Sequence, residues 1–193
     1  TITIKENNVL DGDMETLLIE GVTDILHRLP SLPPAVLVFT SCIHHFMGCD
    51  LALCYRELRK RFPDVDFTDC YMNPIMRKSG LTPDQLMRRQ LYSLLKPRAQ
   101  DDGVNILGNC FPTDETSELV KIIRQTGRPL RDITVCKTYE DYQKMAASTL
   151  HIAYNPPARA GGGWASEGAG TWMVMRERGI RCCSSMTTAN FVS

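Results

Sequence analysis

The segment AVLVFTSCIHHFMGCDLALCYRELRKRF, Ala35–Phe62, joins two kinds of hydrophobic pattern across a cysteine-rich loop. Its first six residues, Ala35–Thr40, form an almost wholly apolar run with β-branched side chains, which is typical of a strand buried on both faces of a sheet. Apolar residues then return at helical spacing over Leu51–Phe62. The segment therefore predicts a strand that passes through a short loop into a helix.

Strands and helices are predicted to alternate along the rest of the chain. The pattern predicts helices over Asp13–Leu29, Thr82–Leu95, Thr113–Gly127, Thr138–Ser148 and Trp172–Gly179, and strands over Val65–Cys70, Val104–Asn109, Asp132–Cys136, Leu150–Asn155 and Ile180–Ser185. Such alternation implies right-handed crossovers and a mostly parallel sheet. We expect a doubly wound, Rossmann-like α/β fold with helices on both faces of a sheet centred on Ala35–Thr40 and Val104–Leu107.

The best candidate for a domain boundary is the polar stretch KPRAQDDG, Lys96–Gly103, which separates two groups of predicted strands and helices. The sequence predicts a first group over residues 1–98, which carries the cysteine-rich loop, and a second group over residues 99–193. One continuous domain is the alternative, because 193 residues also fit a single domain of usual size.

Composition and charge place the chain among ordinary globular proteins. It is 43% hydrophobic and 23% charged, and 22 Lys and Arg balance 22 Asp and Glu, so nothing favours binding to nucleic acid or to a membrane surface. No apolar stretch reaches the roughly 18 residues of a membrane-spanning helix. The polar start TITIKENN lacks a signal-peptide pattern, which predicts a cytoplasmic protein. The chain begins with Thr1 and not with methionine, which suggests an excised piece of a longer protein.

Eight cysteines without a signal peptide are expected to be reduced thiols, metal ligands or buried side chains. Four of them follow the carboxyl ends of predicted strands, where open α/β proteins place their functional sites: Cys42, Cys70, Cys110 and Cys136. One interpretation is a shared site at that edge of the sheet. The other is that they are small buried residues without a chemical role. This reasoning identifies no catalytic residue.

Two thiols of the cysteine-rich segment have different predicted environments. Cys42 lies two residues past a predicted buried strand and before a helix. It is either an iron ligand or reactive thiol, or a partly buried free thiol. Cys54 falls in the interior of the predicted helix Leu51–Phe62, and it is expected to be a core residue.

Other polar residues of the loop are predicted to shape it. His44 and His45 are adjacent and cannot face the same way on a regular element, so at least one should form hydrogen bonds within the loop. Gly48 could provide a turn or a close backbone approach. Asp50 is a natural N-cap for the helix that follows.

Four segments match a known family in order and spacing. TSCIHHFMGCDL, through Cys42, Gly48 and Asp50, resembles the T-x-C-x5-G-D-D element of nitrogenase component 1 proteins. This superfamily includes the molybdenum–iron protein subunits, their cofactor-assembly scaffolds and the dark-operative protochlorophyllide and chlorophyllide reductases. Three further segments are similar to it in the same order, namely NNVLDGDMETLL, VNILGNCFPTDETSELVKIIRQTG and TYEDYQKMAASTLHIAYNP. The resemblance extends over most of Val9–Gly179 and implies a nitrogenase component 1-like fold.

The resemblance implies roles for individual positions. Cys42 matches the family cysteine that ligates an inter-subunit iron–sulfur cluster, the P-cluster in nitrogenase and a 4Fe–4S cluster in the reductases. Cys49 replaces the first Asp of G-D-D and is either an extra ligand or a tolerated substitution. Gly48 and Asp50 are the cofactor-site positions that match the same element. Asn155 stands near the position of the cysteine that ligates the nitrogenase cofactor, which argues against an iron–molybdenum cofactor here.

Electron transfer is the function that the resemblance implies. A component 1 subunit, paired with a homologous subunit, accepts electrons at its iron–sulfur cluster from an ATP-driven iron protein and passes them to a substrate, which the sequence does not identify. The family's other cluster ligands lie upstream of the segment present here. This chain alone is therefore expected to be inactive and to bind a cluster poorly. The alternative is a non-catalytic scaffold or small-metabolite-binding module of the same fold.

Overall fold

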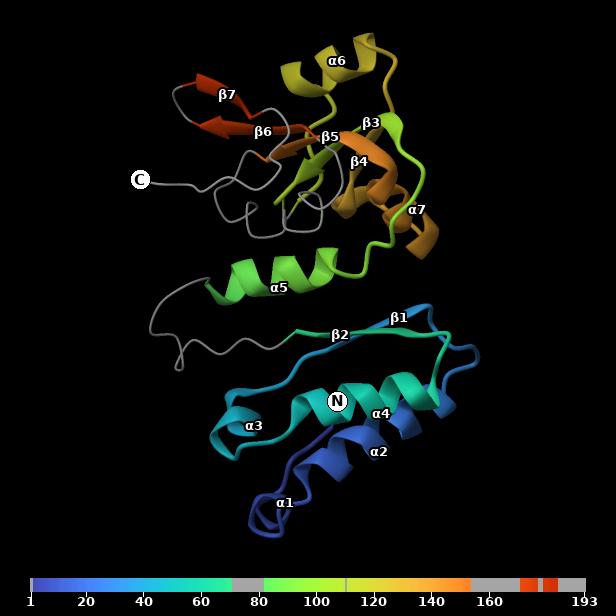
Figure 1. Cartoon of the computed structure of the whole chain (residues 1–193), viewed down its shortest axis with the longest axis vertical. Coiled ribbons are helices and arrows are strands. Elements are labelled where there is room, and N and C mark those ends of the chain that lie inside the picture. The colour runs from blue at the N-terminus through green and yellow to red at the C-terminus, as the bar shows by residue number, and fades with distance from the viewer. Residues whose placement is uncertain (1, 71–81, 110, 154–170, 177–178, 184–193) are drawn as a thin grey trace. The chain divides into compact units, whose positions relative to one another are not determined.

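The computed structural model describes residues 2–70, 82–109, 111–153, 171–176 and 179–183 of the chain. The chain divides into two compact units, Thr1–Pro83 and Asp84–Ser193. The division falls at the start of helix α5 (Pro83–Tyr92), upstream of the Lys96–Gly103 stretch. Figure 1 shows the course of the chain through both units. Within the described segments, no helix has the length and apolar character needed to cross a membrane.

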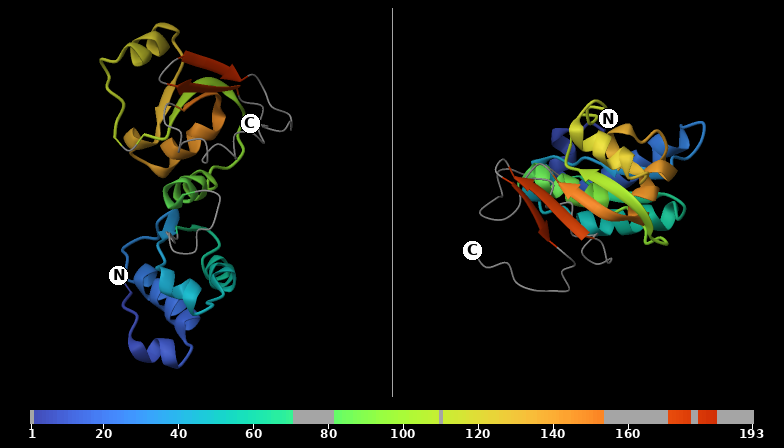
Figure 2. Two further views of the ribbon diagram at one scale, coloured as in Figure 1. Left: turned by 90° about the vertical axis from the view of Figure 1, so that its left-hand side faces the viewer. Right: turned by 90° about the horizontal axis from the view of Figure 1, so that it is seen from above.

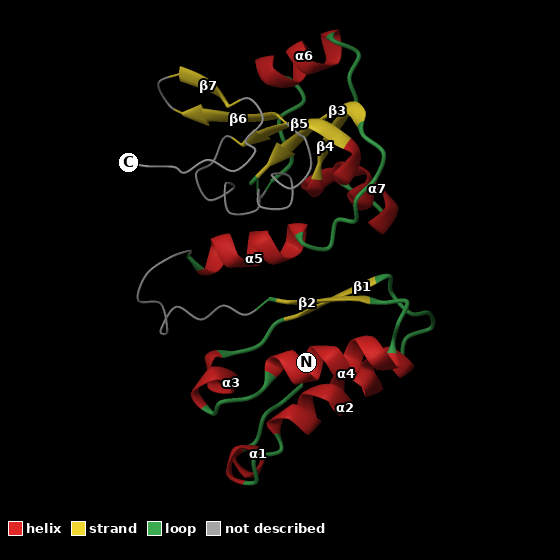
Figure 3. Ribbon diagram, in the orientation of Figure 1, coloured by secondary structure: helices red, strands yellow, loops and turns green. Residues whose placement is uncertain are grey.

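The first unit packs helices against a two-stranded parallel sheet (Figures 2 and 3). Its elements are α1 (Glu6–Leu10), α2 (Met14–His27), β1 (Ala35–Val38), α3 (Cys42–Phe46), α4 (Leu51–Arg61) and β2 (Asp66–Asp69). Strands β1 and β2 pair in parallel, from Ala35 opposite Asp66 to Val38 opposite Asp69. The strand and the helix predicted from the cysteine-rich segment are therefore confirmed, but the predicted loop between them contains the short helix α3.

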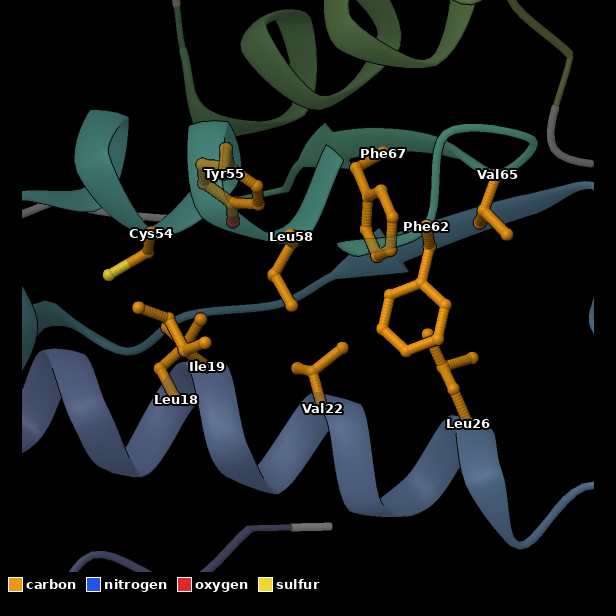
Figure 4. Packing of buried hydrophobic residues seen from close by; sticks show 10 residues of the cluster. All are labelled: Leu18, Ile19, Val22, Leu26, Cys54, Tyr55, Leu58, Phe62, Val65 and Phe67. Atoms are coloured by element: carbon orange, nitrogen blue, oxygen red, sulfur yellow. The ribbon is translucent and has the colours of Figure 1, made fainter. Parts of the chain in front are cut away.

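The core of the first unit lies between α2, α4 and one face of this sheet (Figure 4). Its buried side chains are Leu18, Ile19, Val22 and Leu26 of α2, Cys54, Tyr55 and Leu58 of α4, and Phe62, Val65 and Phe67 around β2. The α2 residues recur at helical spacing and form the apolar stripe that this helix buries.

Strand β1 is not buried on both faces, contrary to the prediction. Val36 and Val38 pack against the core. Leu37, however, is 38% exposed, and Phe39, just after the strand, is 61% exposed. The reason is that α2 and α4 both pack on the face that carries the two valines.

The second unit is built on a five-stranded sheet with the order β4-β3-β5-β6-β7. The strands are β3 (Asp101–Leu107), β4 (Leu130–Asp132), β5 (Ser148–Ala153), β6 (Thr171–Arg176) and β7 (Gly179–Cys183). β3 pairs in parallel with β4 and β5, and β5 pairs in parallel with β6, whereas β7 is antiparallel to β6. The predicted mostly parallel α/β architecture is confirmed. The prediction of one sheet centred on β1 and β3 is wrong, because these strands lie in separate sheets.

Helices cover both faces of the larger sheet, as predicted. One face is covered by α6 (Glu118–Gln125), in a cluster formed by Val104, Ile123 and Ile152. The opposite face is covered by α5 and α7 (Tyr139–Gln143), in a cluster formed by Tyr92, Leu95, Leu107, Tyr142, Met145 and Ala153. Because side chains alternate along a strand, Val104 and Leu107 of β3 belong to different faces.

Two elements of the second unit differ in type from their predictions. Instead of a strand over Asp132–Cys136, β4 ends at Asp132 and Ile133–Val135 forms a 3-10 helix, η1. The Asp132 carboxylate accepts hydrogen bonds from the backbone and hydroxyl of Thr134, at 2.8 and 2.7 Å, which favours a turn over extended backbone. The predicted helix Trp172–Gly179 is instead strand β6, which is paired with β5 on one side and β7 on the other. Tertiary pairing overrides a short helical pattern there.

Helix α6 begins later than the sequence predicts. Thr113 is the predicted N-cap, but the helix begins at Glu118 with Ser117 as its cap. The Ser117 hydroxyl oxygen accepts a hydrogen bond from the Val120 amide at 3.4 Å. The Thr113 hydroxyl donates instead to Asp132 at 2.9 Å. A tertiary contact has therefore replaced the local capping role of Thr113.

A row of polar side chains crosses the larger sheet. Arg131 on β4, Asn105 on β3 and His151 on β5 lie opposite one another in the strand register. Arg131 pairs with Asp101 at 2.5 Å and donates to the Ser148 hydroxyl at 2.7 Å. Ser148 donates to Asn105 Oδ1 at 2.9 Å, and Asn105 Nδ2 lies 3.1 Å from His151 Nδ1. Burial lowers the pKa of His151 to about 4, so the ring is neutral and Nδ1 accepts this bond.

Candidate functional site

Cys42 is the first residue of α3, four residues past the end of β1. Ser41, the N-cap residue, has extended backbone with φ −92° and ψ 167°. The Cys42 side chain is half-buried. The thiol therefore lies just past the carboxyl end of β1, as the sequence predicts, but Cys42 begins the short helix α3, which the sequence does not predict.

His44 fixes the first turn of α3. It is only 8% exposed. Its ring nitrogen Nδ1 lies 3.2 Å from the Ser41 carbonyl oxygen and 3.4 Å from the Ser41 hydroxyl. Its backbone amide donates to the same carbonyl at 3.2 Å. At least one of the adjacent residues His44 and His45 was expected to form hydrogen bonds within the loop, and His44 does so.

The turn from α3 to α4 depends on Gly48 and Asp50. Gly48 has φ of 69° and open space where a Cβ would lie, so the glycine serves the backbone angle and not a close approach. Asp50 caps α4, since its Oδ1 accepts from the Leu53 amide at 2.9 Å. The Asp50 amide donates to Glu15 Oε1 at 2.9 Å. The predicted turn and cap are confirmed, and a role for either residue at a cofactor stays a prediction.

The other thiols of this segment are less accessible for chemistry. Burial, and secondly the Glu15 carboxylate, raise the pKa of Cys49. Cys54 is fully buried, and burial raises its pKa to about 11, so its predicted place in the core is confirmed. A metal that took Cys49 as a second ligand would have to displace a proton that is held more firmly than usual. That second-ligand role also stays a prediction.

The cysteines that follow strands do not share one sheet edge. Cys42 and Cys70 follow β1 and β2 in the first unit, whereas Cys136 follows β4 and η1 in the second. Cys70 is fully buried, and burial raises its pKa to about 11. Cys110 and Asn155 lie outside the described residues. Among the residues that are described, no group of three or more His, Cys, Asp or Glu could hold a metal ion.

Thr40, two residues before Cys42, carries a buried hydroxyl. The residue is 7% exposed, and its Oγ1 has no hydrogen-bond partner within the described part of the chain. A buried polar atom without a partner costs free energy. This hydroxyl is therefore free to bond to a group that lies outside the described residues.

A second polar site, which the sequence reasoning missed, lies just past the carboxyl ends of β3 and β4. We call it the Asn109 cluster, and it comprises Asn109, Thr113, Asp132 and Thr134. Asn109 and Asp132 are each 4% exposed. The Asp132 carboxylate accepts five hydrogen bonds: from the backbone and hydroxyl of Thr134, from the backbone and hydroxyl of Thr113, and from Asn109 Nδ2.

Tyr92 of α5 ties that helix to the same edge of the sheet. It is 1% exposed and shares a hydrogen bond with the backbone of Gly108, at the end of β3. Burial raises the pKa of Tyr92 to about 12. The sequence signal for this edge was the Gly108–Asn109 pair at the end of the predicted strand Val104–Asn109. The next strand was predicted to begin at Asp132, whereas β4 ends there, and this difference concealed the rest of the cluster.

Comparisons with known proteins bear on the fold. No family model matches the sequence, and no curated protein sequence matches it either. Among solved structures, the chain is similar to "Nitrogenase Cp1 at pH 6.5", at 14% identity with a TM-score of 0.64, and to "Nitrogenase Cp1 at pH 5", at 14% identity with a TM-score of 0.65. Each alignment covers 89% of this chain but only 34% and 35% of the nitrogenase chains, so the chain spans about a third of their length. The chain therefore has a nitrogenase component 1-like fold.

Proposed function

We propose that the chain forms part of a nitrogenase-like component 1 subunit, in which Cys42 supplies one thiolate to an iron–sulfur cluster shared with a homologous subunit. The observation that carries the proposal is the place of Cys42 at the start of α3, just beyond β1, in a component 1-like fold. Its thiol is half-buried, so a partner subunit can reach it and cover the part that this chain leaves exposed.

The surroundings of Cys42 fit a cluster ligand. Iron–sulfur clusters are held by cysteine thiolates, and hydrogen bonds to the sulfurs tune their reduction potential. The Thr40 hydroxyl, which has no bond to any described residue, can donate such a hydrogen bond. Cys49 and Cys54 are poorer candidates, because burial raises the pKa of both thiols and opposes loss of the proton.

The chain supplies only part of such a site. One thiolate cannot hold a cluster, and the described residues offer no group of three or more metal-ligating side chains. The other ligands would come from outside the described residues, and the family resemblance implies that they lie upstream of this segment. When bound, the cluster would accept electrons from an ATP-driven iron protein and pass them towards a substrate. The part played by this chain is to position Cys42, through the extended backbone of Ser41, the His44 hydrogen bonds to Ser41 and the Gly48 turn.

A second candidate function is a non-catalytic scaffold or small-metabolite-binding module of the same fold. The observation that favours it is the incomplete set of metal ligands in the described part of the chain. Iron content separates the two functions, because a scaffold of this kind needs no cluster bound through Cys42.

Cys42→Ala is expected to abolish cluster binding in the assembled full-length protein while leaving the fold intact. Alanine cannot form the iron–thiolate bond, and a half-buried thiol contributes little to packing. The measurement is iron content and visible absorbance of the anaerobically purified assembly. Cys54→Ala is the matched control: we expect it to cost about 1 kcal/mol of core packing and no iron.

Two results would contradict the ligand assignment. The first is a Cys42→Ala assembly that keeps its full iron content and is reduced at the same rate. The second is equal iron loss in the Cys42→Ala and Cys54→Ala proteins, since general destabilisation would then account for both.

A further inference from the structure

The backbone groups of β1 and β2 alternate between the two edges of this small sheet. The carbonyl oxygens of Pro34 and Val38 accept hydrogen bonds from the amides of Asp66 and Cys70, at 3.0 and 2.9 Å. In a parallel pair such bonds come from every second residue, so the even-numbered residues of both strands face the partner strand. The N–H and C=O groups of the odd-numbered residues face outward, and in and just after β1 these residues are Ala35, Leu37 and Phe39.

The outward edge of β2 is protected, whereas that of β1 is open. Arg59 of α4 donates to the outward-facing Phe67 carbonyl oxygen at 3.0 Å, and Asp66 and Asp69 place a charge at each end of β2. Proteins use such groups to keep further strands away from a sheet edge. Strand β1 contains no charged residue and no proline. Within the described part of the chain it pairs with no second strand, and its outward backbone groups have no hydrogen-bond partner.

The core of the first unit is also incompletely covered along β1. Val36 and Val38 face this core but remain half-buried, whereas Phe67 of β2, which points into the same core (Figure 4), is only 3% exposed. On the other face of β1, Leu37 and Phe39 are largely exposed. A further strand alongside β1 would cover apolar surface on both faces, which is favourable. It would also extend a sheet of two strands, which is few for a stable sheet.

A second copy of β1 fits this edge in antiparallel pairing. Hydrogen-bonded pairs form between residues whose backbone groups both face the partner, so odd-numbered residues must lie opposite odd-numbered ones. When Leu37 lies opposite Leu37 of the second copy, Ala35 lies opposite Phe39 on both sides of this central pair. The smallest side chain of the edge therefore meets the largest. The paired segments carry no charged side chain, so no charge repulsion opposes the contact.

We propose that two copies of the chain form a dimer by antiparallel pairing of β1 with β1, about a two-fold axis at Leu37. The product is a four-stranded sheet with the order β2-β1-β1-β2. The same edge is used by both copies, so the contact closes at two chains. The interface belongs to the first unit and does not use the Cys42 thiol, so the proposal does not depend on the iron–sulfur cluster proposed there.

The test measures the mass of the iron-free 193-residue chain by sedimentation equilibrium. A reducing buffer keeps the eight cysteines from linking chains through disulfides, and low ionic strength preserves the effect of introduced charges. We expect the mass to rise with protein concentration towards twice the 21.7 kDa of one chain, and no further.

Two variants of Leu37 test the pairing and its register. Leu37→Lys and Leu37→Glu each place two like charges opposite one another at the two-fold axis, so each protein should keep the mass of one chain where the parent is a dimer. An equimolar mixture of the two variants brings opposite charges together at this position and should restore the dimer. Restoration also shows that both variants are folded. Ile25→Lys is the matched control, because Ile25 is exposed on α2 to a similar extent and the dimer should persist in this variant.

A parent chain that stays monomeric at all concentrations would overturn the proposal and would leave the β1 edge to a strand of a different protein. Dimers that persist in both Leu37 variants, or that disappear equally in Ile25→Lys, would show that the contact lies elsewhere. A mixture of the Leu37 variants that stays monomeric would overturn the antiparallel register. Masses that grow beyond two chains would overturn the closed two-fold contact.

Discussion

Asp132→Ala is expected to lower the free energy of unfolding by about 3–5 kcal/mol. Asp132 is 4% exposed, and its carboxylate accepts five hydrogen bonds, from Thr113, Thr134 and Asn109. Its removal leaves these donors in a buried site without an acceptor, which costs more than the lost bonds alone. The loss should appear in urea unfolding followed by circular dichroism. Amide hydrogen exchange should become faster at the carboxyl ends of β3 and β4.

Asp114→Ala is the matched control for this prediction. Asp114 accepts hydrogen bonds from the backbone and hydroxyl of Thr116, both at 2.8 Å, but it is exposed. Water replaces the lost carboxylate there, so we expect a much smaller change in unfolding free energy. Equal losses in the two variants would show that burial of the Asn109 cluster adds nothing, and would contradict the prediction.

The local features around Cys42 could be predicted because each depends on a few neighbouring residues. Gly48 allows a positive φ that other residues rarely adopt. Asp50 caps α4 through a bond to an amide three residues ahead. Burial of Cys54 follows from its place within an amphipathic helix. None of these roles requires knowledge of which strands are neighbours.

The Asn109 cluster could not be predicted in the same way, because its bonds join distant positions. Thr113 and Asp132 are 19 residues apart, and Asn109 and Thr134 are 25 apart. Locally, Thr113 has the pattern of a helix N-cap. Only the parallel pairing of β3 with β4 brings Thr113 to Asp132 and leaves Ser117 to cap α6.

The hydrophobic pattern also could not predict which strands are neighbours in a sheet. Alternating strands and helices correctly predicted parallel pairing within β1–β2 and β3–β4–β5. The same pattern contains nothing that assigns β1 and β3 to separate sheets. It also failed at Trp172–Gly179, where pairing with both β5 and β7 decides the conformation. Short apolar runs fit either a strand or a helix turn until their hydrogen-bond partners are known.

Acidification is expected to destabilise the second unit through His151. Burial lowers the pKa of His151 to about 4, against its ordinary value of 6.5, so the unfolded chain binds this proton more readily than the folded one between these pH values. The stability that depends on neutral His151 is therefore complete above pH 6.5 and is lost as the pH falls to about 4. At about 1.4 kcal/mol for each pKa unit, the loss reaches about 3 kcal/mol.

His151→Asn isolates this effect, because an asparagine oxygen can still accept the bond from Asn105 Nδ2, which lies 3.1 Å from His151 Nδ1, but does not titrate. Urea unfolding at steps between pH 6.5 and about 4 should show the difference in unfolding free energy between the parent chain and this variant changing by up to about 1.4 kcal/mol per pH unit. Carboxylates titrate alike in both proteins, so their contributions cancel. If the His151→Asn curve stays parallel to the parent curve down to pH 4, protonation of His151 does not limit the acid stability of this fold.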